Sequence, residues 1–600
     1  MFLLFVFFPC LSVLSQTFQK VKFTPEPAAE VPKDIQPMAP SAEGKAIIKD
    51  VLGNYVTIKR KEIPYQPPLK SDVLVGGPDI YLQDGSETAL AINYDNMNNL
   101  VAGYNEHWDF NPDITHSNST NGNISWTSRS FPVGGGTYTD YPFDPWANPG
   151  NASSEFYSTQ IRNDAASANS HSVVSRSIDG GASFSLFFER VKAVFQDREM
   201  ADIDRTSARG GGAGSTHDGK VYLCYDDWGA GFSGYVGSFL QAVSSAGAPL
   251  TEIQISGTGA PPFRGSQMQP VPGITDGTVY VMASAIGGVP SGRTIFAYFH
   301  EITGAGAGAI YTKSTLSWEA AGQQLGVTSR WGLNGHRIDN HGYLDIDLSS
   351  GPRRGHLYFI YNRNPNSFDA TMDQGDIRLS VSTTGASSWA TTTIPTAAGK
   401  TQYFPMLDVD DQGWLHVSYY QNESGLVNGG VLNASSANLY YTLSTNGGLS
   451  WLTPVQINAP ANTLDMPDPP PDRSAAAYYL VGDYAQVQAR GTASSTKVYT
   501  LWTGFDKDRS GALGDTDERV LCTIVCAGKS GDANGDGSVG IPDIIYLANY
   551  VFKGGPEPFP ICAGDCNGSG GNPAIADIIY LSNHVFKGGP VPVKIGLCCI

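Results

Sequence analysis

The chain has 600 residues, too many for one compact core, and its 41% hydrophobic and 11% aromatic content excludes a disordered protein. Its 69 glycines and 38 prolines are typical of a large, turn-rich β protein with attached segments. Lys and Arg number 38 against 56 Asp and Glu, and the net charge of -18 argues against a nucleic-acid or anionic-membrane partner.

The N-terminus begins with an apolar run at residues 2–14 that is too short to span a bilayer. Small residues follow it, so we predict a signal peptide over 1–15 and a secreted, extracellular protein, alternatively one attached to the cell surface. No later run is long enough for a membrane helix, so no transmembrane segment is expected after signal removal. Residues 16–72 are rich in Pro and Lys without a sustained period, which predicts an extended linker.

A turn motif of the form S-x-D-x-G-x-[ST]-[WF] occupies residues 177–184. It returns at 444–451 with Asn446 in the Asp position, in degenerate form at 382–389, and as a remnant from Ser314 to Trp318. Its Asp or Asn bonds nearby backbone amides and its glycines adopt positive φ, which indicates a structural hairpin turn rather than catalytic aspartates. A marker that recurs once per repeat is typical of a solenoid, propeller or array.

Six segments combine an apolar alternating strand with a following Tyr-rich strand, and their period of two predicts β structure. The first strands begin at residues 89, 201, 268, 343, 406 and 484, so successive starts lie 112, 67, 75, 63 and 78 residues apart. This spacing suits four-stranded antiparallel blades, and the sequence therefore predicts an all-β fold, a six-bladed β-propeller. The polar stretch between Asn105 and Asn169 is predicted to be an insert of blade one that covers one face as a lid.

The turns, together with residues 98–104 and the Gly482-Asp483-Tyr484 sequence, resemble the bacterial sialidase-like, BNR-repeat propellers over about residues 73 to 526. In an enzyme of that family, the resemblance implies three arginines around the substrate carboxylate, a Tyr activated by a Glu, and an Asp as acid and base. The family's Phe/Tyr-Arg-Ile-Pro opening is absent from this sequence, so no catalytic residue is transferred to it.

Propeller ligands lie over the central channel, and we expect them where the inner strand of each blade begins. The carboxylates there are the candidate catalytic residues: Asp197, Glu199, Asp339 and Asp483. The candidate ligand-binding residues are Glu87, Gln267, His341, Gln402, Tyr403 and Tyr484. The alternative is that these polar side chains only solvate the channel and bond exposed strand ends.

Three functions follow from these observations. The first hypothesis is a carbohydrate-directed glycoside hydrolase of sialidase type. The second is a non-catalytic propeller that binds a glycan or a surface protein in an extracellular assembly, using Tyr, Trp and amide groups. The third is a purely structural propeller.

The cysteines separate by location. Cys10 leaves with the signal peptide, and Cys224 is expected to be buried in a strand. The remaining six lie at or beyond the end of the propeller: Cys522, Cys526, Cys562, Cys566, Cys598 and Cys599. An even set in a small exported module predicts disulfides with fifteen pairings open, and a zinc site is the alternative.

The C-terminal region, residues 527–600, contains two loops with the oxygen-ligand spacing of an EF-hand, each followed by an amphipathic helix. The first loop offers Asp532, Asn534, Asp536, Ser538 and Asp543, and the second offers Asp565, Asn567, Ser569 and Asp577. We therefore predict that the region binds Ca²⁺, the alternative being Asp- and Gly-rich turns without metal.

This tandem repeat resembles a type I dockerin. The resemblance implies a small α-helical, calcium-stabilised domain that binds a cohesin-type partner on a scaffold or cell surface. The Ser-Thr pair that the family often uses for this contact is replaced by Ile541-Pro542 and Ile575-Ala576, so calcium binding is the firmer expectation.

Overall fold

The structure is a computed structural model that describes most of the chain from residue 84 onward and short stretches before it. The described residues are 45–49, 55–59, 72–74, 84–107, 114–123, 125–130, 140–163, 169–205, 217–229, 234–257, 268–274, 277–287, 294–303, 310–316, 342–363, 376–423, 437–458, 462–463, 485–491, 495–506, 517–525, 528–536, 538–558, 560–595 and 597–598. The predicted signal peptide lies outside them.

The N-terminal unit, Met1–Gln66, contains one antiparallel pair of strands. β1 (Lys45–Lys49) pairs with β2 (Tyr55–Lys59), with Ile47 opposite Thr57. Each strand is only five residues long, and β1 has a run of three apolar residues rather than an alternating pattern, so neither stood out among the surrounding prolines. The segment predicted to be an extended linker therefore contains a small sheet.

The second unit, Pro67–Ile600, contains seven antiparallel sheets in its described part. The first is β4 (Asp84–Ile92), β5 (Leu100–His107), β6 (Ile114–Ser119) and β7 (Thr127–Ser130); the second is β8 (Asp140–Pro149), β9 (Phe156–Asn163), β10 (Ser170–Ser177) and β11 (Ser185–Lys192); the third is β12 (Phe195–Ile203), β13 (Val221–Trp228), β14 (Tyr235–Val243) and β15 (Pro249–Gly257). The fourth is β16 (Met268–Pro272), β17 (Val279–Gly287), β18 (Thr294–Thr303) and β19 (Ile310–Leu316); the fifth is β20 (Tyr343–Ile346), β21 (Leu357–Arg363), β22 (Asp376–Ser382) and β23 (Ala390–Thr393); the sixth is β24 (Gln402–Val409), β25 (Leu415–Asn422), β26 (Ala437–Ser444) and β27 (Val455–Gln456).

The seventh sheet joins the two ends of the ring. It contains β28 (Asn462–Thr463), β29 (Gln486–Arg490), β30 (Lys497–Asp506), β31 (Asp517–Ile524) and the N-terminal strand β3 (Asp72–Leu74). β3 pairs with β31, so a strand from before the first blade completes the last one.

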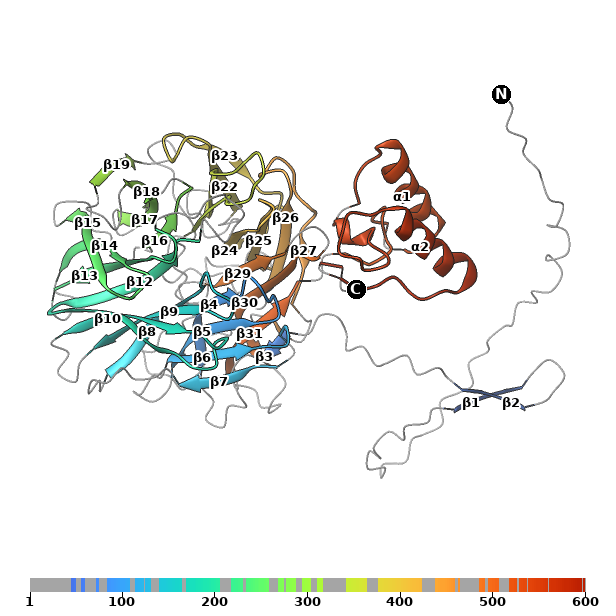
Figure 1. Cartoon of the computed structure of the whole chain (residues 1–600), viewed down its shortest axis with the longest axis horizontal. Helices are drawn as coiled ribbons and strands as arrows, with labels where there is room; N and C mark the ends of the chain where they lie inside the picture. The colour runs from blue at the N-terminus through green and yellow to red at the C-terminus, as the bar shows by residue number, and fades with distance from the viewer. Residues whose placement is uncertain are drawn as a thin grey trace. The chain divides into compact units, whose positions relative to one another are not determined.

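The first strand of each sheet contacts the first strand of the next, in the order β4, β8, β12, β16, β20, β24, β29 and back to β4. This closed circuit makes the unit a β-propeller of seven blades around a central channel (Figure 1). Middle strands such as β13 and β25 are buried along their whole length because the blades pack face to face, whereas the outer strand β23 is largely exposed.

The prediction of six blades is wrong because the described residues form seven. The gap of 112 residues between two predicted first strands holds two blades, and the predicted lid contains the two outer strands of the first blade and the two inner strands of the second. β8 escaped notice because it contains Pro142, Pro145 and Pro149 and is bulged twice, which destroys its alternation. Prolines are tolerated here because an innermost strand is an edge of its sheet.

The turn motif lies between the third and fourth strands of its blade, and the structure contains a fourth copy that the sequence analysis missed. In residues 119–126, Asn121 Oδ1 accepts from Ser125 N at 3.1 Å, as Asp179 accepts from Ser183 and Asn446 from Ser450. Asn123 replaces the second glycine and still adopts a φ of 72°. We call these four segments, 119–126, 177–184, 382–389 and 444–451, the box turns.

The box turns join neighbouring blades. A Cβ on Gly181 would lie 2.3 Å from Val101 of the preceding blade, and one on Gly448 would lie 2.4 Å from Leu379. Asn123 donates to the Cys522 carbonyl of the last blade at 2.9 Å. The proposed remnant at Ser314 is wrong, since Ser314 lies within the outermost strand β19 rather than in a turn.

The C-terminal region forms two matched helices, α1 (Ile541–Lys553) and α2 (Ile575–Lys587), with a 3-10 turn, η3 (Ile561–Ala563), between them. Each helix ends at a glycine with left-handed backbone, Gly554 or Gly588. A disulfide joins Cys562 to Cys598, and the Cys566 thiol is buried and free. The expectation that all six late cysteines form disulfides is therefore wrong for Cys566.

Candidate functional site

An open cavity lies in the central channel, and the space inside it that is free of protein atoms, including open solvent, is about 540 Å³. Its described wall comes from six of the seven innermost strands or the residues directly after them, chiefly from their C-terminal halves. The polar lining is Asn148, Asp202, Arg205, Gln269, Asp345, Asp408, Gln486, Gln488 and Arg490, and the lining also includes Trp146 and Tyr343, which are 3% and 6% exposed.

Several of these side chains bond to the backbone of the next innermost strand. Asp345 Oδ2 accepts from Val409 N at 2.7 Å, Asp408 Oδ2 from Ala489 N at 2.7 Å, and Gln269 Oε1 from Leu344 N at 2.9 Å. Two further bonds follow the same rule: Asn148 Nδ2 to the Ala201 carbonyl at 2.6 Å, and Leu90 N to Gln486 Oε1 at 2.5 Å. The polar side chains of the cavity wall therefore also link neighbouring innermost strands to one another.

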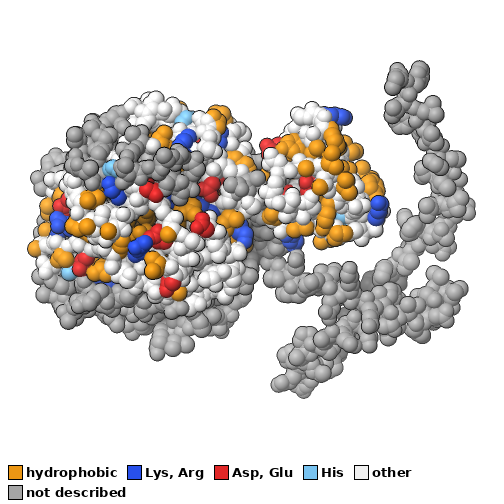
Figure 2. All heavy atoms as spheres, in the orientation of Figure 1, with side chains coloured by type: hydrophobic (Ala, Val, Ile, Leu, Met, Phe, Trp, Pro, Cys, Tyr) orange, Lys and Arg blue, Asp and Glu red, His pale blue; other side chains and the backbone are white. Residues whose placement is uncertain are grey.

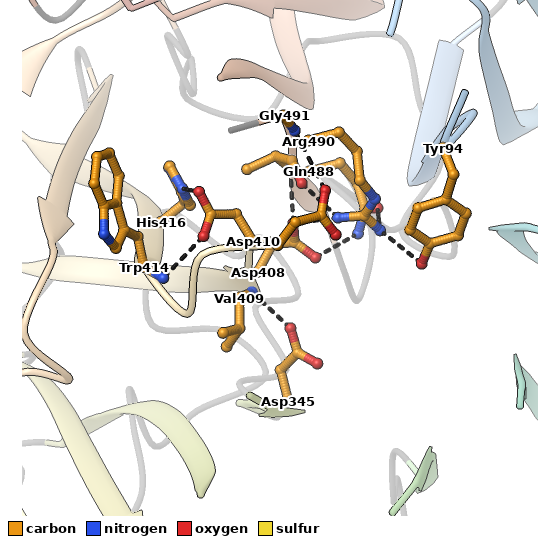
Figure 3. Close-up of polar contacts among 12 residues, drawn as sticks. Tyr94, Asp345, Asp408, Val409, Asp410, Trp414, His416, Gln488, Arg490 and Gly491 are labelled. Atoms are coloured by element: carbon orange, nitrogen blue, oxygen red, sulfur yellow. Dashed lines mark hydrogen bonds and ion pairs between the residues drawn. The ribbon is translucent and has the colours of Figure 1, made fainter. Parts of the chain in front are cut away.

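Arg490 and Asp408 form a buried ion pair in this wall (Figure 3). Arg490 Nη1 lies 2.8 Å from Asp408 Oδ2, and Arg490 Nη2 donates to Gln488 Oε1 at 3.1 Å and to the Tyr94 hydroxyl at 3.5 Å. Gln488 Nε2 returns a bond to Asp408 Oδ1 at 3.3 Å. The guanidinium and the carboxylate therefore compensate each other's charge inside the protein.

Arg205, directly after β12, makes a second ion pair with Asp202, at 2.8 Å between Nη2 and Oδ1, and donates from Nη1 to the Pro149 carbonyl at 3.2 Å. Its guanidinium lies 5.5 Å from the centre of the Tyr94 ring, and that of Arg490 lies 4.8 Å from it. Tyr94 thus contacts both arginines of the cavity.

Two residues after Asp345 and Asp408, a second aspartate closes the turn that follows the strand. Asp347 Oδ1 accepts from Ser349 N at 2.8 Å, and Asp410 Oδ1 accepts from Gln412 N and Trp414 N at 2.9 Å each. Asp410 Oδ2 also lies 3.2 Å from His416 Nε2 (Figure 3). The second aspartate of each pair therefore has a structural task outside the cavity.

The predicted site residues that the structure describes lie toward the N-terminal ends of the innermost strands, away from this wall. Glu199 is 1% exposed, and its Oε1 accepts from Ser172 Oγ at 2.6 Å in the preceding blade. Asp197 is paired in register with Asp226 on β13. Neither belongs to the described lining of the cavity, so their proposed catalytic role stays a prediction without a ligand site beside it.

Gln402 and Tyr403 are buried at the start of β24. Gln402 bonds to Thr396, Ala397 and Gln421, and Tyr403 stacks on Tyr420 with 5.5 Å between ring centroids. Burial raises the pKa of Tyr403 well above its ordinary value, so its hydroxyl stays protonated. Glu87 lies in β4, beside a bulge, without a described side chain. The other predicted residues lie outside the described part: Gln267, Asp339, His341, Asp483 and Tyr484.

A recurring sequence pattern marks the aspartates of the cavity, although the sequence analysis did not assign them to the site. The predicted first strands contained the D-x-D pairs 202 and 204, 345 and 347, and 408 and 410. Each pair stands at the C-terminal end of an alternating strand, so its first aspartate continues the side-chain alternation into the channel. We placed the ligand at the other ends of the strands instead, and the two arginines carried no motif at all.

The two C-terminal loops have the same internal hydrogen bonds. Asp543 accepts from Asn534 N at 3.1 Å and Gly540 N at 2.8 Å, and Asp577 accepts from Asn567 N at 3.1 Å and Ala574 N at 2.9 Å. At the loop starts, Asp532 accepts from Asp536 N, and Asp565 from Ser569 N. Ser538 N donates to Asp536 Oδ1 at 2.8 Å.

The donor chemistry of these loops fits Ca²⁺, a hard cation that takes carboxylate, amide and carbonyl oxygens. Asp532, Asp543, Asp565 and Asp577 are all buried, and burying carboxylates requires a compensating charge. The described residues do not contain a group of three or more His, Cys, Asp or Glu side chains already gathered to hold a metal ion. Nor does any helix in the described part have the length and apolar character to cross a membrane.

The fold and the cavity define this chain as an all-β propeller protein with a small helical C-terminal region. No protein-family model and no curated protein matches the sequence. The α-L-arabinofuranosidase of family GH93 from Fusarium graminearum, solved with arabinobiose, is 10% identical, with 58% of this chain and 92% of that chain covered and a TM-score of 0.38. The endosialidase of phage phi92 is 9% identical, covering 80% and 71%, with a TM-score of 0.37. An ulvan lyase of family PL25 is 10% identical, covering 75% and 94%, with a TM-score of 0.40. Likeness this weak carries no argument about function, and the fold rests on the sheets and their closed circuit.

Proposed function

We propose that the propeller is a secreted, carbohydrate-binding protein whose ligand occupies the central cavity. The observation that carries the proposal is the stacked pair of Trp146 and Tyr343, with ring centroids 6.3 Å apart and planes 16° apart, in the same wall as the amides and carboxylates. Concave sites with aromatic surface and a few fixed polar groups suit small ligands, and a sugar offers both an apolar ring face and hydroxyl groups.

The proposal is binding rather than hydrolysis. A glycoside hydrolase needs one carboxyl group that holds a proton and a second that acts as nucleophile or base. Asp345 and Asp408 each accept a backbone N–H, and Asp408 also accepts from a guanidinium, so both carboxylates already hold neighbouring strands together. The sialidase-type hydrolase remains the second candidate on the sequence resemblance alone.

The test is a glycan array probed with the full chain in the presence of Ca²⁺, followed by calorimetry on each bound glycan. Trp146→Phe should weaken binding about tenfold by shrinking the aromatic surface. Trp451→Phe, at a box turn outside the cavity wall, is the matched control and should bind as the parent does. Equal losses in both variants, or an array without any bound glycan, would contradict the proposal, and release of reducing sugar from a bound glycan would restore the hydrolase.

We further propose that residues 527–600 form a dockerin-like domain that binds two calcium ions. Asp532, Asn534, Asp536, Ser538 and Asp543 would hold the first ion, and Asp565, Asn567, Ser569 and Asp577 the second. Bound calcium would add positive charge beside the buried carboxylates of both loops. Asp→Ala changes at residue 532 or 536 should abolish the calcium-dependent gain of helical circular dichroism, whereas a spectrum unchanged by chelator would refute the calcium proposal.

Attachment to a cohesin-type scaffold or surface partner is supported by the outer surface of the two helices. Ile541, Ile545 and Phe552 of α1 are 51–61% exposed. Ile575, Ile579 and Phe586 of α2 stand at the equivalent positions and are 52–61% exposed. Figure 2 shows apolar side chains gathered over this region. Exposed apolar residues on a small domain mark an interaction surface, so Phe552→Ser together with Phe586→Ser should abolish calcium-dependent capture by a cohesin domain without changing helical content.

A further inference from the structure

The two arginines of the cavity are already engaged by the protein itself. Arg205 is 7% exposed and binds Asp202 and the Pro149 carbonyl. Arg490 is 1% exposed and binds Asp408 at 2.8 Å, besides the Ala489 carbonyl and the Gln488 side chain. A guanidinium recognises a ligand carboxylate or sulfate through a pair of parallel N–H groups, and both of these guanidinium groups direct N–H groups at internal acceptors.

Tyr94 contacts both of these guanidinium groups. Tyr94 lies within 5.5 Å of the Arg205 guanidinium and 4.8 Å of the Arg490 guanidinium, measured to its ring centre. A cation over an aromatic face is partly desolvated and attracted to the ring, which further holds each guanidinium in place. An anionic ligand would compete with these internal acceptors for the two guanidinium groups.

The charge of the described wall acts in the same direction. Three carboxylates, Asp202, Asp345 and Asp408, line the cavity against two guanidinium groups. The whole chain carries a net charge of -18, so the long-range field also disfavours an anion. Both the local contacts and the overall charge therefore weaken binding of an acidic sugar.

We infer that the central cavity selects uncharged glycans and rejects those that carry carboxylate or sulfate groups, with Asp202 and Asp408 as the residues that determine this specificity. The inference rests on the proposed carbohydrate-binding function and adds the class of ligand. Neutral sugars bind through hydroxyl groups, which accept from and donate to the amides and carboxylates of the wall without displacing an ion pair. The two aspartates determine specificity mainly through their ion pairs with Arg205 and Arg490, and only secondarily through direct contact with the ligand.

The experiment uses the full chain on an array that carries neutral oligosaccharides beside uronic-acid, sialic-acid and sulfated ones, followed by calorimetry with the best neutral glycan and its uronic-acid counterpart. The parent protein should bind the neutral member only. Asp202→Asn keeps the size and the carbonyl acceptor of the side chain but removes the charge that engages Arg205, so it should raise affinity for the uronic-acid glycan about tenfold. Asp345→Asn is the matched control, because it removes the same charge from the wall without releasing Arg205.

The outcomes separate the two proposals. If an acidic glycan binds the parent as tightly as its neutral counterpart, the inference is overturned while the carbohydrate function stands. If Asp345→Asn gains acidic binding as strongly as Asp202→Asn, general charge rather than the engaged arginine decides, and the role assigned to Asp202 fails. If no glycan binds at all, both fail together. Melting curves of both variants establish that each is folded before its affinities are compared.

Discussion

The pair of Arg490 and Asp408 offers the sharpest test of how the ring is held. Asp408→Ala removes the carboxylate and leaves a guanidinium that is 1% exposed without its charge partner. It also removes the acceptor of Ala489 N at 2.7 Å. Removing one partner of a buried ion pair lowers the free energy of unfolding by about 3–5 kcal/mol, because an uncompensated charge stays in the interior.

Because the propeller is large, this loss of unfolding free energy corresponds to a small but measurable decrease in melting temperature. At about 2.1 cal/mol/K per residue, a ring of about 450 residues has an unfolding entropy of about 1 kcal/mol/K. Asp408→Ala should therefore lower the melting temperature by about 3–5 °C. All ten tryptophans lie at or before residue 502, so tryptophan fluorescence follows the propeller without a signal from the C-terminal region.

Two further variants decide whether charge is the cause. Gln269→Ala removes a neutral side chain that accepts from Leu344 N at 2.9 Å at the same kind of junction, and should lower the melting temperature by about 1 °C. The double change Asp408→Ala with Arg490→Met removes the stranded charge and should recover at least about half of the single variant's loss. The reasoning is refuted if Asp408→Ala shifts the curve no further than Gln269→Ala, or if the double change is the sum of its parts.

Three other predictions concern local structure. Ala386 occupies a left-handed position with φ 59° in a box turn, so Ala386→Gly should raise the propeller's melting temperature by about 1–2 °C, and a decrease would contradict the strain. Burial acts to raise the pKa of Asp179, but hydrogen bonds from Ser183 and Ser177 lower it below its ordinary value overall. Its carboxylate therefore stabilises the fold above the unfolded pKa of about 3.9, and the advantage is lost as pH falls through the folded pKa, so parent and Asp179→Asn melting curves should converge in acid. Cys562→Ser should lower the stability of the C-terminal region by about 4 kcal/mol, because its bond to Cys598 closes a loop of 36 residues; urea unfolding followed by circular dichroism measures this.

The sequence predicted those strands whose side chains alternate. β13 and β25 were recognised by a period of two and by their tyrosines, and both lie in the middle of a blade. β8 was not recognised, because an innermost strand forms hydrogen bonds on one side only and so tolerates three prolines and two bulges. Edge strands are where the sequence signal for a blade is weakest, and the count of blades failed there.

The box turns show a similar limit. The copy at 119–126 has Asn123 where the copies at 177–184 and 444–451 have Gly181 and Gly448 and the copy at 382–389 has Ala386. Asparagine reaches positive φ more readily than most residues, and here its side chain also bonds to the last blade. Positive φ at this position is therefore adopted by three residue types, and glycine does not define the motif.

The candidate site failed for a different reason, since contacts between the first strands of different blades are not encoded within one repeat. The channel wall joins Asp408 to Arg490, 82 positions apart, and Arg205 to Tyr94, which belongs to another blade. Each of these residues is unremarkable in its own repeat. Only closure of the ring brings them together, and the number of blades had to be right before their register could be predicted.

The D-x-D pairs show what the aspartates around the cavity already do in the fold. In the fifth and sixth blades, the first aspartate binds the next innermost strand and the second closes the following turn, so both are fixed by the fold. Trp146 and Tyr343 are 3% and 6% exposed, so a ligand of the proposed site would meet these engaged carboxylates and only a small part of the two aromatic side chains. Mutations of Asp345 or Asp408 will change stability and binding together, whereas Trp146→Phe changes the recognition surface while leaving every inter-strand hydrogen bond described above in place.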